Sequence, residues 1–269
     1  MNETLKQLFR DGENGHTESQ NQLGDAYFDG NGLKQDNIKA FEWYLRAAEH
    51  GHALAQYNVA YAYANGLGTQ KNMEKAIEWY GKSAAQGVAL AKYILAKLYI
   101  DGQYVAQDIS KVLDLLQKAS DQGLELAQYD IGTIYLEGKI VLADIENGIK
   151  YLTLAADQGH KVAQFNLGLA YTNLSEPDYD IAEKYLQEAS YNGHFTAMKE
   201  LCRLYTIYKK DYAKGLLWTI VALEYCEKEA EQRFKRIKNN LHSKLSSAEC
   251  DAISNEAKDI IARLDASLC

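Results

Sequence analysis

The feature that most constrains this chain is a pattern that returns every 36 residues. Three series of equivalent positions carry it, each with members 36 residues apart: Leu23, Val59, Leu95 and Ile131; Tyr27, Tyr63, Tyr99 and Tyr135; Gly51, Gly87, Gly123 and Gly159. A unit of this length cannot bury its own apolar face, so neighbouring units must stack and share a core. The period therefore predicts a stacked array with a long common surface, and binding is the expected use of that surface.

Each unit is predicted to be a pair of helices. In the first unit, residues 17–29 hold Leu23 and Tyr27 at helical spacing, and Gly30 follows as a left-handed C-terminal cap. After a short turn, Asp36 precedes a run in which small and apolar residues recur at i, i+3, i+4, i+7 and i+8 from Ala40 onward. We call the first helix of a unit helix A and the second helix B. The pattern predicts an all-α fold.

The same offsets divide the chain of 269 residues into repeats and caps. Residues 1–15 hold a lone helix, expected as an N-terminal cap. Residues 227–269 hold two more helices, the second preceded by the capping-box sequence SSAE, and their polar surface suits a C-terminal cap. The predicted repeats between the caps are 16–51, 52–87, 88–123, 124–159, 160–193 and 194–226. We expect them to form one elongated domain.

The motifs of the unit are A-x-x-x-L-G-x-x-Y, G-x-G-x-x-x-D and K-A-x-x-W-Y-x-x-A-A-x-x-G. They resemble the Sel-one-like repeat (SLR) family, whose members are related to tetratricopeptide repeats. The first unit matches with LGDAY and KAFEWYLRAAEHG, and the second with VAYAY and KAIEWYGKSAAQG. The resemblance implies a right-handed α/α superhelix, or solenoid, of about six helix-turn-helix repeats with helical caps. It also implies a role as an adaptor or scaffold in protein complexes.

Charge and composition narrow the class of partner. The formal charge of −8 disfavours nucleic acid, because duplex binding needs Lys and Arg to neutralise phosphates. Residues 228–244 are locally basic, with six Lys or Arg against two Glu, and are interpreted as a solvated helix face. No apolar run is long enough for a membrane span, and the N-terminal residues lack the pattern of a secretion signal. We expect a cytoplasmic, monomeric, bacterial protein.

Recurring polar residues invite a catalytic or metal-binding interpretation. Histidine recurs at His16, His52, His160 and His194, but these positions lie whole repeats apart, too far for one ion. A second series precedes each helix B, where an N-cap acceptor is needed: Asp36, Asn72, Asp108, Asp144, Asp178 and Asp211. The four cysteines lack the spacing of a disulfide framework and are expected to be free. The sequence therefore predicts no catalytic residue, no metal and no cofactor.

The positions two residues before and two after the L-G leucine are expected to face the concave groove of a tetratricopeptide-like array. The candidate partner-binding residues at these positions are Tyr57, Tyr61, Tyr93, Lys97, Tyr129, Thr133, Phe165 and Leu169. Asp29, Asp101 and Glu137 are predicted to form an acidic rim beside them. Aromatic residues in a groove suit interface anchors, although the same residues could serve only to pack neighbouring helices. The implied guest is a basic or polar peptide with apolar anchors.

The leading hypothesis is a non-catalytic interaction protein that holds one protein partner in this groove. One alternative is an immunity protein that neutralises a bacterial toxin or effector. A remote alternative is a weak hydrolase acting on β-lactam or peptidoglycan material, a property associated with some cysteine-rich relatives. No activated nucleophile or acid–base pair in the sequence favours that last hypothesis.

Overall fold

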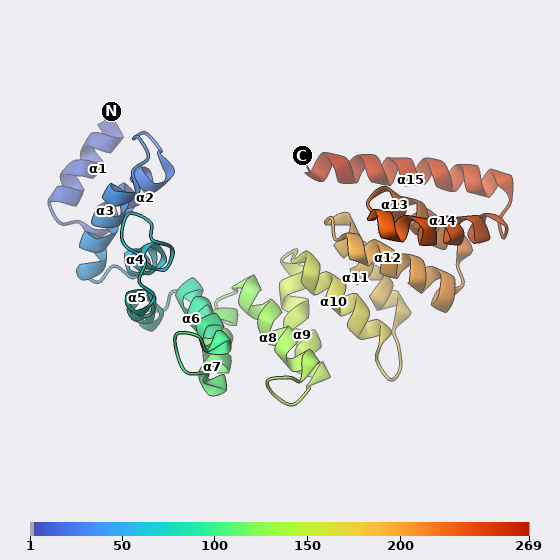
Figure 1. Ribbon diagram of the computed structural model, residues 1–269, viewed down its shortest axis with the longest axis horizontal. Coiled ribbons are helices and arrows are strands. Elements are labelled where there is room, and N and C mark those ends of the chain that lie inside the picture. The colour runs from blue at the N-terminus through green and yellow to red at the C-terminus, as the bar shows by residue number, and fades with distance from the viewer. Residues whose placement is uncertain (1–2, 269) are drawn as a thin grey trace. The chain divides into compact units, whose positions relative to one another are not determined.

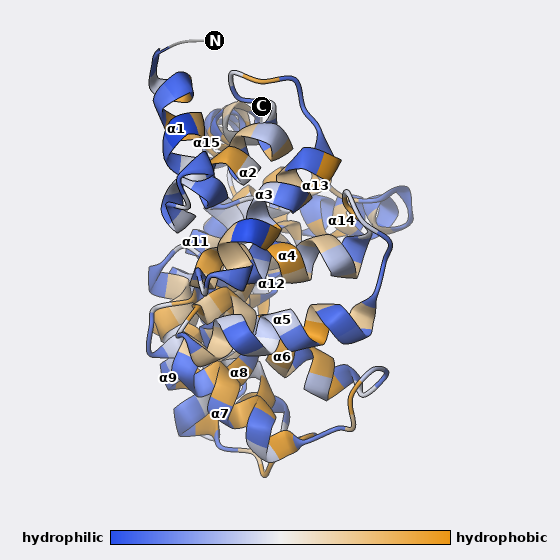
Figure 2. Ribbon diagram, turned by 90° about the vertical axis from the view of Figure 1, so that its left-hand side faces the viewer, coloured by the Kyte–Doolittle hydropathy of each residue, from blue (hydrophilic) through white to orange (hydrophobic). Residues whose placement is uncertain are grey.

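A computed structural model describes residues 3–268 of the chain. In this range it contains fifteen α-helices, one π-helix and no strand (Figure 1). The helices carry both apolar and polar residues, as amphipathic packing requires (Figure 2). The predicted all-α class, with about six helix pairs, is therefore confirmed. None of the described helices combines the length and apolar composition of a membrane span.

The helices follow the order that the repeat predicts. The first helices of the six pairs are α2 (Thr17–Asp29), α4 (Ala53–Asn65), α6 (Ala89–Asp101), α8 (Glu125–Glu137), α10 (Lys161–Thr172) and α12 (Phe195–Arg203). Their B partners are α3 (Asn37–Glu49), α5 (Met73–Ala85), α7 (Ile109–Ser120), α9 (Ile145–Asp157), α11 (Tyr179–Tyr191) and α13 (Tyr212–Glu224). The flanking helices are α1 (Glu3–Glu13), α14 (Lys228–His242) and α15 (Ser247–Leu268). The boundaries predicted for domains and repeats stay a prediction.

Side-chain caps explain where the B helices begin. Each predicted acceptor, from Asp36 to Asp211, stands at an N-cap and accepts at least one hydrogen bond from a backbone N–H of its helix. At α7, for example, Lys111 N donates to Asp108 Oδ1 at 3.1 Å. A capped N–H group needs no other partner, and the carboxylate also interacts favourably with the helix dipole. The predicted capping role of this series is confirmed.

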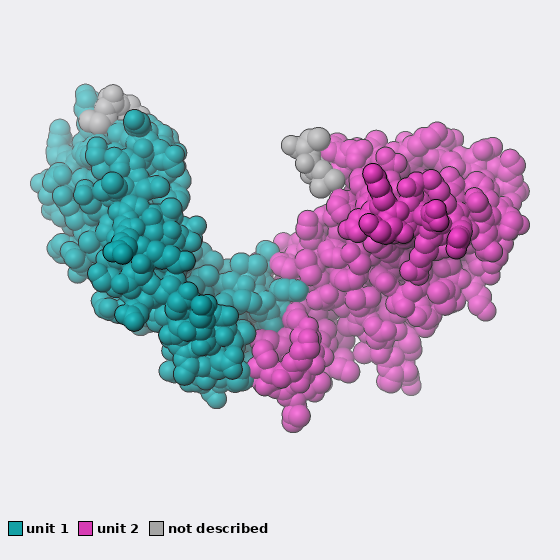
Figure 3. Space-filling model, viewed as in Figure 1, with its two compact units in different colours: residues 1–131 teal, residues 132–269 magenta. Residues whose placement is uncertain are grey.

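The chain forms two compact units, residues 1–131 and residues 132–269 (Figure 3). The core of the first unit begins where Leu5 of α1 packs with Leu23 and Trp43 of the first repeat. The larger cluster of the second unit surrounds Trp218 of α13 and includes Ile260 of α15. Both α1 and α15 therefore contribute apolar residues to the cores of the repeats beside them.

The sixth pair departs from the others at the end of its A helix. There α12 continues as a π-helix, η1 (Leu204–Lys209), and Lys210 adopts a left-handed φ of 54° before α13 begins. No glycine loop separates the two helices, because Lys210 and Asp211 alone join them. The periodic pattern of the sequence weakens in the same repeat.

A polar network attaches η1 to the preceding helix B. Glu183 of α11 accepts hydrogen bonds from Tyr205 Oη at 2.5 Å and Lys214 Nζ at 3.0 Å, and Lys209 Nζ also donates to it. Burial alone would raise the pKa of Glu183, but these hydrogen bonds outweigh burial and lower it to about 2. The carboxylate is therefore ionised at neutral pH and joins α11 to the sixth pair.

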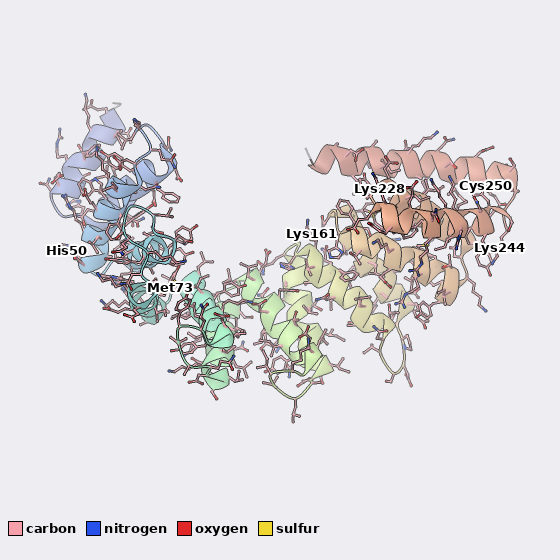
Figure 4. The ribbon with its side chains drawn as sticks, viewed as in Figure 1. His50, Met73, Lys161, Lys228, Lys244 and Cys250 are labelled. Atoms are coloured by element: carbon pink, nitrogen blue, oxygen red, sulfur yellow. The ribbon has the colours of Figure 1, made fainter. Side chains whose placement is uncertain are left out.

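Two helices, α14 and α15, follow the last repeat. Ser246 and Glu249 form a reciprocal capping box at the start of α15, with Ser246 N to Glu249 Oε2 at 2.8 Å and Glu249 N to Ser246 Oγ at 3.3 Å. The basic segment runs along α14 between Lys228 and Lys244, both labelled in Figure 4. Phe234 and Leu241 are its buried residues, whereas most of its Lys and Arg side chains are exposed. The segment is a solvated helix face, as predicted.

Candidate protein-binding surface

In three of the A helices, one face carries large residues that are exposed or only partly covered. In α4, Leu54, Tyr57 and Tyr61 stand at i, i+3 and i+7, which places them on one side of a helix. The equivalent residues are Leu90, Tyr93 and Lys97 in α6, and Leu126, Tyr129 and Thr133 in α8. We call this side the A face.

Three exposed leucines recur on the A face of the first unit. Leu54, Leu90 and Leu126 stand 36 residues apart and are 52%, 40% and 38% exposed. These leucines are absent from the predicted binding residues, because the prediction covers only the positions two residues before and two after the L-G leucine. The sequence does contain a pattern that points to these leucines. Each stands three residues before a predicted tyrosine, and helical periodicity puts the two residues on one face.

Polar contacts hold neighbouring A helices side by side. Between α2 and α4, Asn58 Nδ2 donates to Asn21 Oδ1 at 3.1 Å, and His52 Nε2 lies 2.9 Å from Glu18 Oε2. Between α6 and α8, Lys97 Nζ lies 2.8 Å from Asp130 Oδ2. These contacts set consecutive A faces next to one another within the first unit.

The predicted aromatic ladder divides into packed and exposed members. Tyr57 is half-buried against Tyr80 of helix B, with ring centroids 5.6 Å apart. Burial and the nearby carboxylate of Asp130 raise the pKa of Tyr93 to about 12. By contrast, Tyr61 is 42% exposed. The ladder therefore contributes both to packing between helices and to the open surface.

The remaining predicted residues occupy different environments. Phe165 stacks on His194 with ring centroids 4.4 Å apart, which is a packing contact between repeats. Tyr129 is half-buried. Of the acidic rim, Asp29 and Asp101 are exposed, and Glu137 pairs with Lys139 at 3.1 Å.

A pocket of about 400 Å³ opens between the first two repeats. Aromatic side chains from three helices form much of its wall: Phe28 of α2, Phe41 of α3, and Tyr57 and Tyr61 of α4. Asp25 and Asp29, one helical turn apart on α2, also line it. We call it the first-repeat pocket.

The carboxylate of Asp25 is held by uncharged donors. Tyr44 Oη donates to Asp25 Oδ1 at 2.7 Å, and Asn21 Nδ2 donates to Asp25 Oδ2 at 3.2 Å. Burial raises the pKa of Asp25, the hydrogen bond from Tyr44 opposes that rise, and the charges of Asp29 and Glu18 add to it. Neither Asp25 nor Asp29 forms an ion pair with another described residue. The pocket therefore carries negative charge without a cation to balance it.

An equivalent pocket of about 320 Å³ occurs in the second unit. It lies three repeats later, since Thr133 occupies the same position of its repeat as Asp25 does in the first. Leu169 replaces Tyr61, and Glu137 replaces Asp29. Here Thr133 stands where Asp25 carries a charge, and Glu137 already has Lys139 as a partner. The two pockets therefore share a position in the repeat but differ in charge and aromatic content.

Two of the four repeated histidines cap an A helix, whereas His16 and His194 make no capping hydrogen bond. His52 Nδ1 accepts from Ala55 N at 3.2 Å, and His160 Nδ1 accepts from Ala163 N at 3.1 Å, so both side chains cap an A helix. Their role as junction residues was predicted, whereas the capping hydrogen bond was not. Among residues 3–268, no group of three or more His, Cys, Asp or Glu side chains is arranged to hold a metal ion.

A family model described as the Sel1 repeat matches residues 17–52, 53–88, 89–124, 126–160 and 161–194. The chain belongs to the Sel1 repeat family. The match begins at α2 and ends where α12 is about to begin. The sixth pair lies outside the matched Sel1 repeats, in agreement with its weaker pattern and its π-helix. No curated protein sequence matches the chain.

Solved structures of Sel1 repeat proteins are similar to this one. A Sel1 repeat protein from Oxalobacter formigenes is 28% identical with a TM-score of 0.68, over 83% of this chain and 99% of that chain. A protective antigen present in uropathogenic Escherichia coli strains, which displays an SLR fold, is 27% identical with a TM-score of 0.72. That alignment covers 97% of this chain and 58% of the antigen. The predicted resemblance to Sel-one-like repeats is thus confirmed by sequence and by structure.

Proposed function

We propose that this chain is a non-catalytic interaction protein that binds a segment of a protein partner on the A face of its first unit. Sel1 repeats generally mediate interactions between proteins, which supports a binding role of this kind. The observation that carries the proposal is the row of Leu54, Leu90 and Leu126, exposed at the same position of three consecutive repeats. Large apolar side chains that recur on one open face are typical of interaction sites.

The neighbouring residues have the chemistry of an interface. Tyr61 is exposed beside the leucines and offers a large contact area with few rotatable bonds, as interface tyrosines do. Lys97 and the rim carboxylates Asp29 and Asp101 supply a polar border around the apolar residues. An apolar centre with a polar rim is the usual organisation of a protein interface. The guest predicted by this surface is a peptide segment with apolar anchors.

Capture with matched variants tests the proposal. The tagged chain is used to isolate partners from the cells that produce it, and the affinity of each captured protein is then measured. Leu90→Glu and Tyr61→Ala both change exposed residues of the A face, so their melting temperatures should stay close to that of the wild type. Loss of an anchor at the centre of an interface costs about 2 kcal/mol, or roughly thirtyfold in affinity.

The control variant is Leu154→Glu in α9. Leu154 is 42% exposed, similar to Leu90, but it lies on a helix B. A partner that binds the wild type and Leu154→Glu alike, but binds Leu90→Glu and Tyr61→Ala far more weakly, supports the proposal. Equal binding by all four proteins would exclude the A face as the binding surface.

A further inference from the structure

The fold does not require the two carboxylates that line the first-repeat pocket. Its carboxylates, Asp25 and Asp29, lie within a space that aromatic rings also line. A half-buried carboxylate without a cation is unfavourable, because burial removes water that would otherwise solvate the charge. Stability alone would favour an uncharged residue there, such as the Thr133 found in the equivalent pocket of the second unit.

The groups around Asp25 favour binding of a cationic side chain. Both carboxylate oxygens already accept one hydrogen bond each, from Tyr44 and Asn21, and each retains a second acceptor site. These two donors are neutral, so they fix the position of the carboxylate without cancelling its charge. The carboxylates of Asp29 and Glu18 add further negative potential around Asp25.

The aromatic walls narrow the choice among cations. Tyr57, Tyr61, Phe28 and Phe41 all line the pocket, and a flat cation stacks favourably on an aromatic ring. A guanidinium group is planar, carries five N–H donors and binds carboxylates through paired hydrogen bonds. An ammonium group satisfies a carboxylate as a point charge but does not stack as a plane. The pocket volume of about 400 Å³ is sufficient for a single side chain of this size.

We propose that the first-repeat pocket binds an arginine side chain of the protein partner, between the carboxylates of Asp25 and Asp29 and the rings of Tyr57 and Tyr61. This inference rests on the proposed function, because the arginine would belong to the segment that crosses the A face. The arginine would bind at the first repeat. Apolar residues of the same segment would contact Leu54, Leu90 and Leu126 in the next three repeats. The equivalent pocket in the second unit lacks the charged and aromatic residues that this guest requires.

The test uses the full chain and N-acetyl-arginine N-methylamide as the probe. Two lining residues, Ala40 and Ala62, carry methyl groups that can be labelled with ¹³C and followed by NMR. Ala170, in the equivalent pocket of the second unit, is the internal reference. Saturable shifts of Ala40 and Ala62 without a shift of Ala170 are expected. The citrulline analogue, which keeps the shape and loses the charge, should bind at least about tenfold more weakly.

Three variants connect the binding to named residues. Asp29→Asn and Asp25→Asn should each weaken binding of the arginine probe by about tenfold or more, because each removes one charged acceptor. Asp29 is exposed and its substitution should leave the melting temperature unchanged, so the inference does not depend on Asp25→Asn folding normally. Glu137→Gln, the same change at the equivalent position of the other pocket, should leave probe binding unaltered.

Several results would overturn the inference. They are the absence of shifts at Ala40 and Ala62, equal binding of the citrulline analogue or of the corresponding lysine derivative, and unchanged binding by Asp29→Asn. None of these depends on a captured partner. Failure of the proposed function would appear separately, as partner binding that is insensitive to Leu90→Glu and Tyr61→Ala.

Discussion

At the scale of single residues, the L-G glycine sets how closely helices A and B approach. A Cβ atom built at Gly24 of α2 would lie 2.4 Å from the ring of Tyr44 in α3. Tyr44 is buried and holds Asp25, so its ring cannot move away without disturbing the first-repeat pocket. We therefore expect Gly24→Ala to lower the free energy of unfolding by about 1–3 kcal/mol, measured by urea denaturation.

Gly81 provides the matched control. It lies inside α5, and a Cβ atom there would meet no heavy atom within 4 Å. Alanine is a better helix former than glycine, so Gly81→Ala should raise the stability by about 0.5–1 kcal/mol. Equal effects of the two substitutions, in sign and size, would show that close approach to Tyr44 does not govern the choice of glycine.

Sequence alone could predict some of these residues and not others. The caps at Asp36 and Asp108 follow from local rules, because an N-cap acts on backbone groups two or three residues away. The difference between Tyr57, half-buried, and the exposed Tyr61 depends on a contact with Tyr80 of the next helix, and a repeat pattern does not specify which side chains touch. The pocket carboxylate Asp25 likewise depends on Tyr44, 19 residues further along the chain.

At the scale of elements, the network around Glu183 should make the joint between α11 and the sixth pair sensitive to acid. The folded state holds the pKa of Glu183 at about 2, below its ordinary value of 4.5. Its contribution to stability is therefore complete above the ordinary pKa and is lost as the pH falls towards 2. At about 1.4 kcal/mol per pH unit, the full contribution is on the order of 3 kcal/mol.

Glu183→Gln tests this linkage when stability is measured at pH 7 and at pH 3. The variant should be clearly less stable than the wild type at pH 7, and the difference should fall to less than half at pH 3. Glu78→Gln is the control, since Glu78 forms an exposed i,i+4 ion pair with Lys82 and should matter little at either pH. A difference between wild type and Glu183→Gln that is the same at both pH values would contradict the assignment.

The ends of the helices show where local sequence patterns predict structure correctly. Helix α2 occupies residues 17–29, the range that spacing and the Gly30 cap predict. The π-helix η1 was not predicted, because its stretch from Leu204 to Lys209 keeps an ordinary helical pattern. Its geometry depends on the missing glycine loop and on contacts between Tyr205, Lys209 and Glu183, which join residues more than twenty positions apart.

At the scale of the whole molecule, damage to one repeat should stay local. Gly87 follows the C-cap of α5 with a left-handed φ of 101°, and the nearest atom to a Cβ there would be Gln122 Nε2 at 3.9 Å. Valine at this position would therefore be strained by the backbone conformation rather than by crowding, at a cost of about 1–2 kcal/mol. Because solenoid stability is approximately a sum of neighbour terms, the loss should concentrate in α5 and α6.

Hydrogen exchange of Gly87→Val can follow this loss helix by helix. Amides of α5 and α6 should exchange faster than in the wild type, while α14 and α15 in the C-terminal cap should keep their protection. A uniform loss of protection from α1 to α15 would instead indicate that the chain unfolds as one cooperative block.

The two equivalent pockets have a consequence for how this molecule can acquire new partners. Each is built by two neighbouring A helices and the B helix between them, and the residues that differ, such as Asp25 against Thr133 or Tyr61 against Leu169, stand at fixed positions of the repeat. A substitution at one such position alters which side chain a single pocket accepts and leaves the supporting core in place. Evolution or design can therefore change the preference of the chain one pocket at a time, without a new fold.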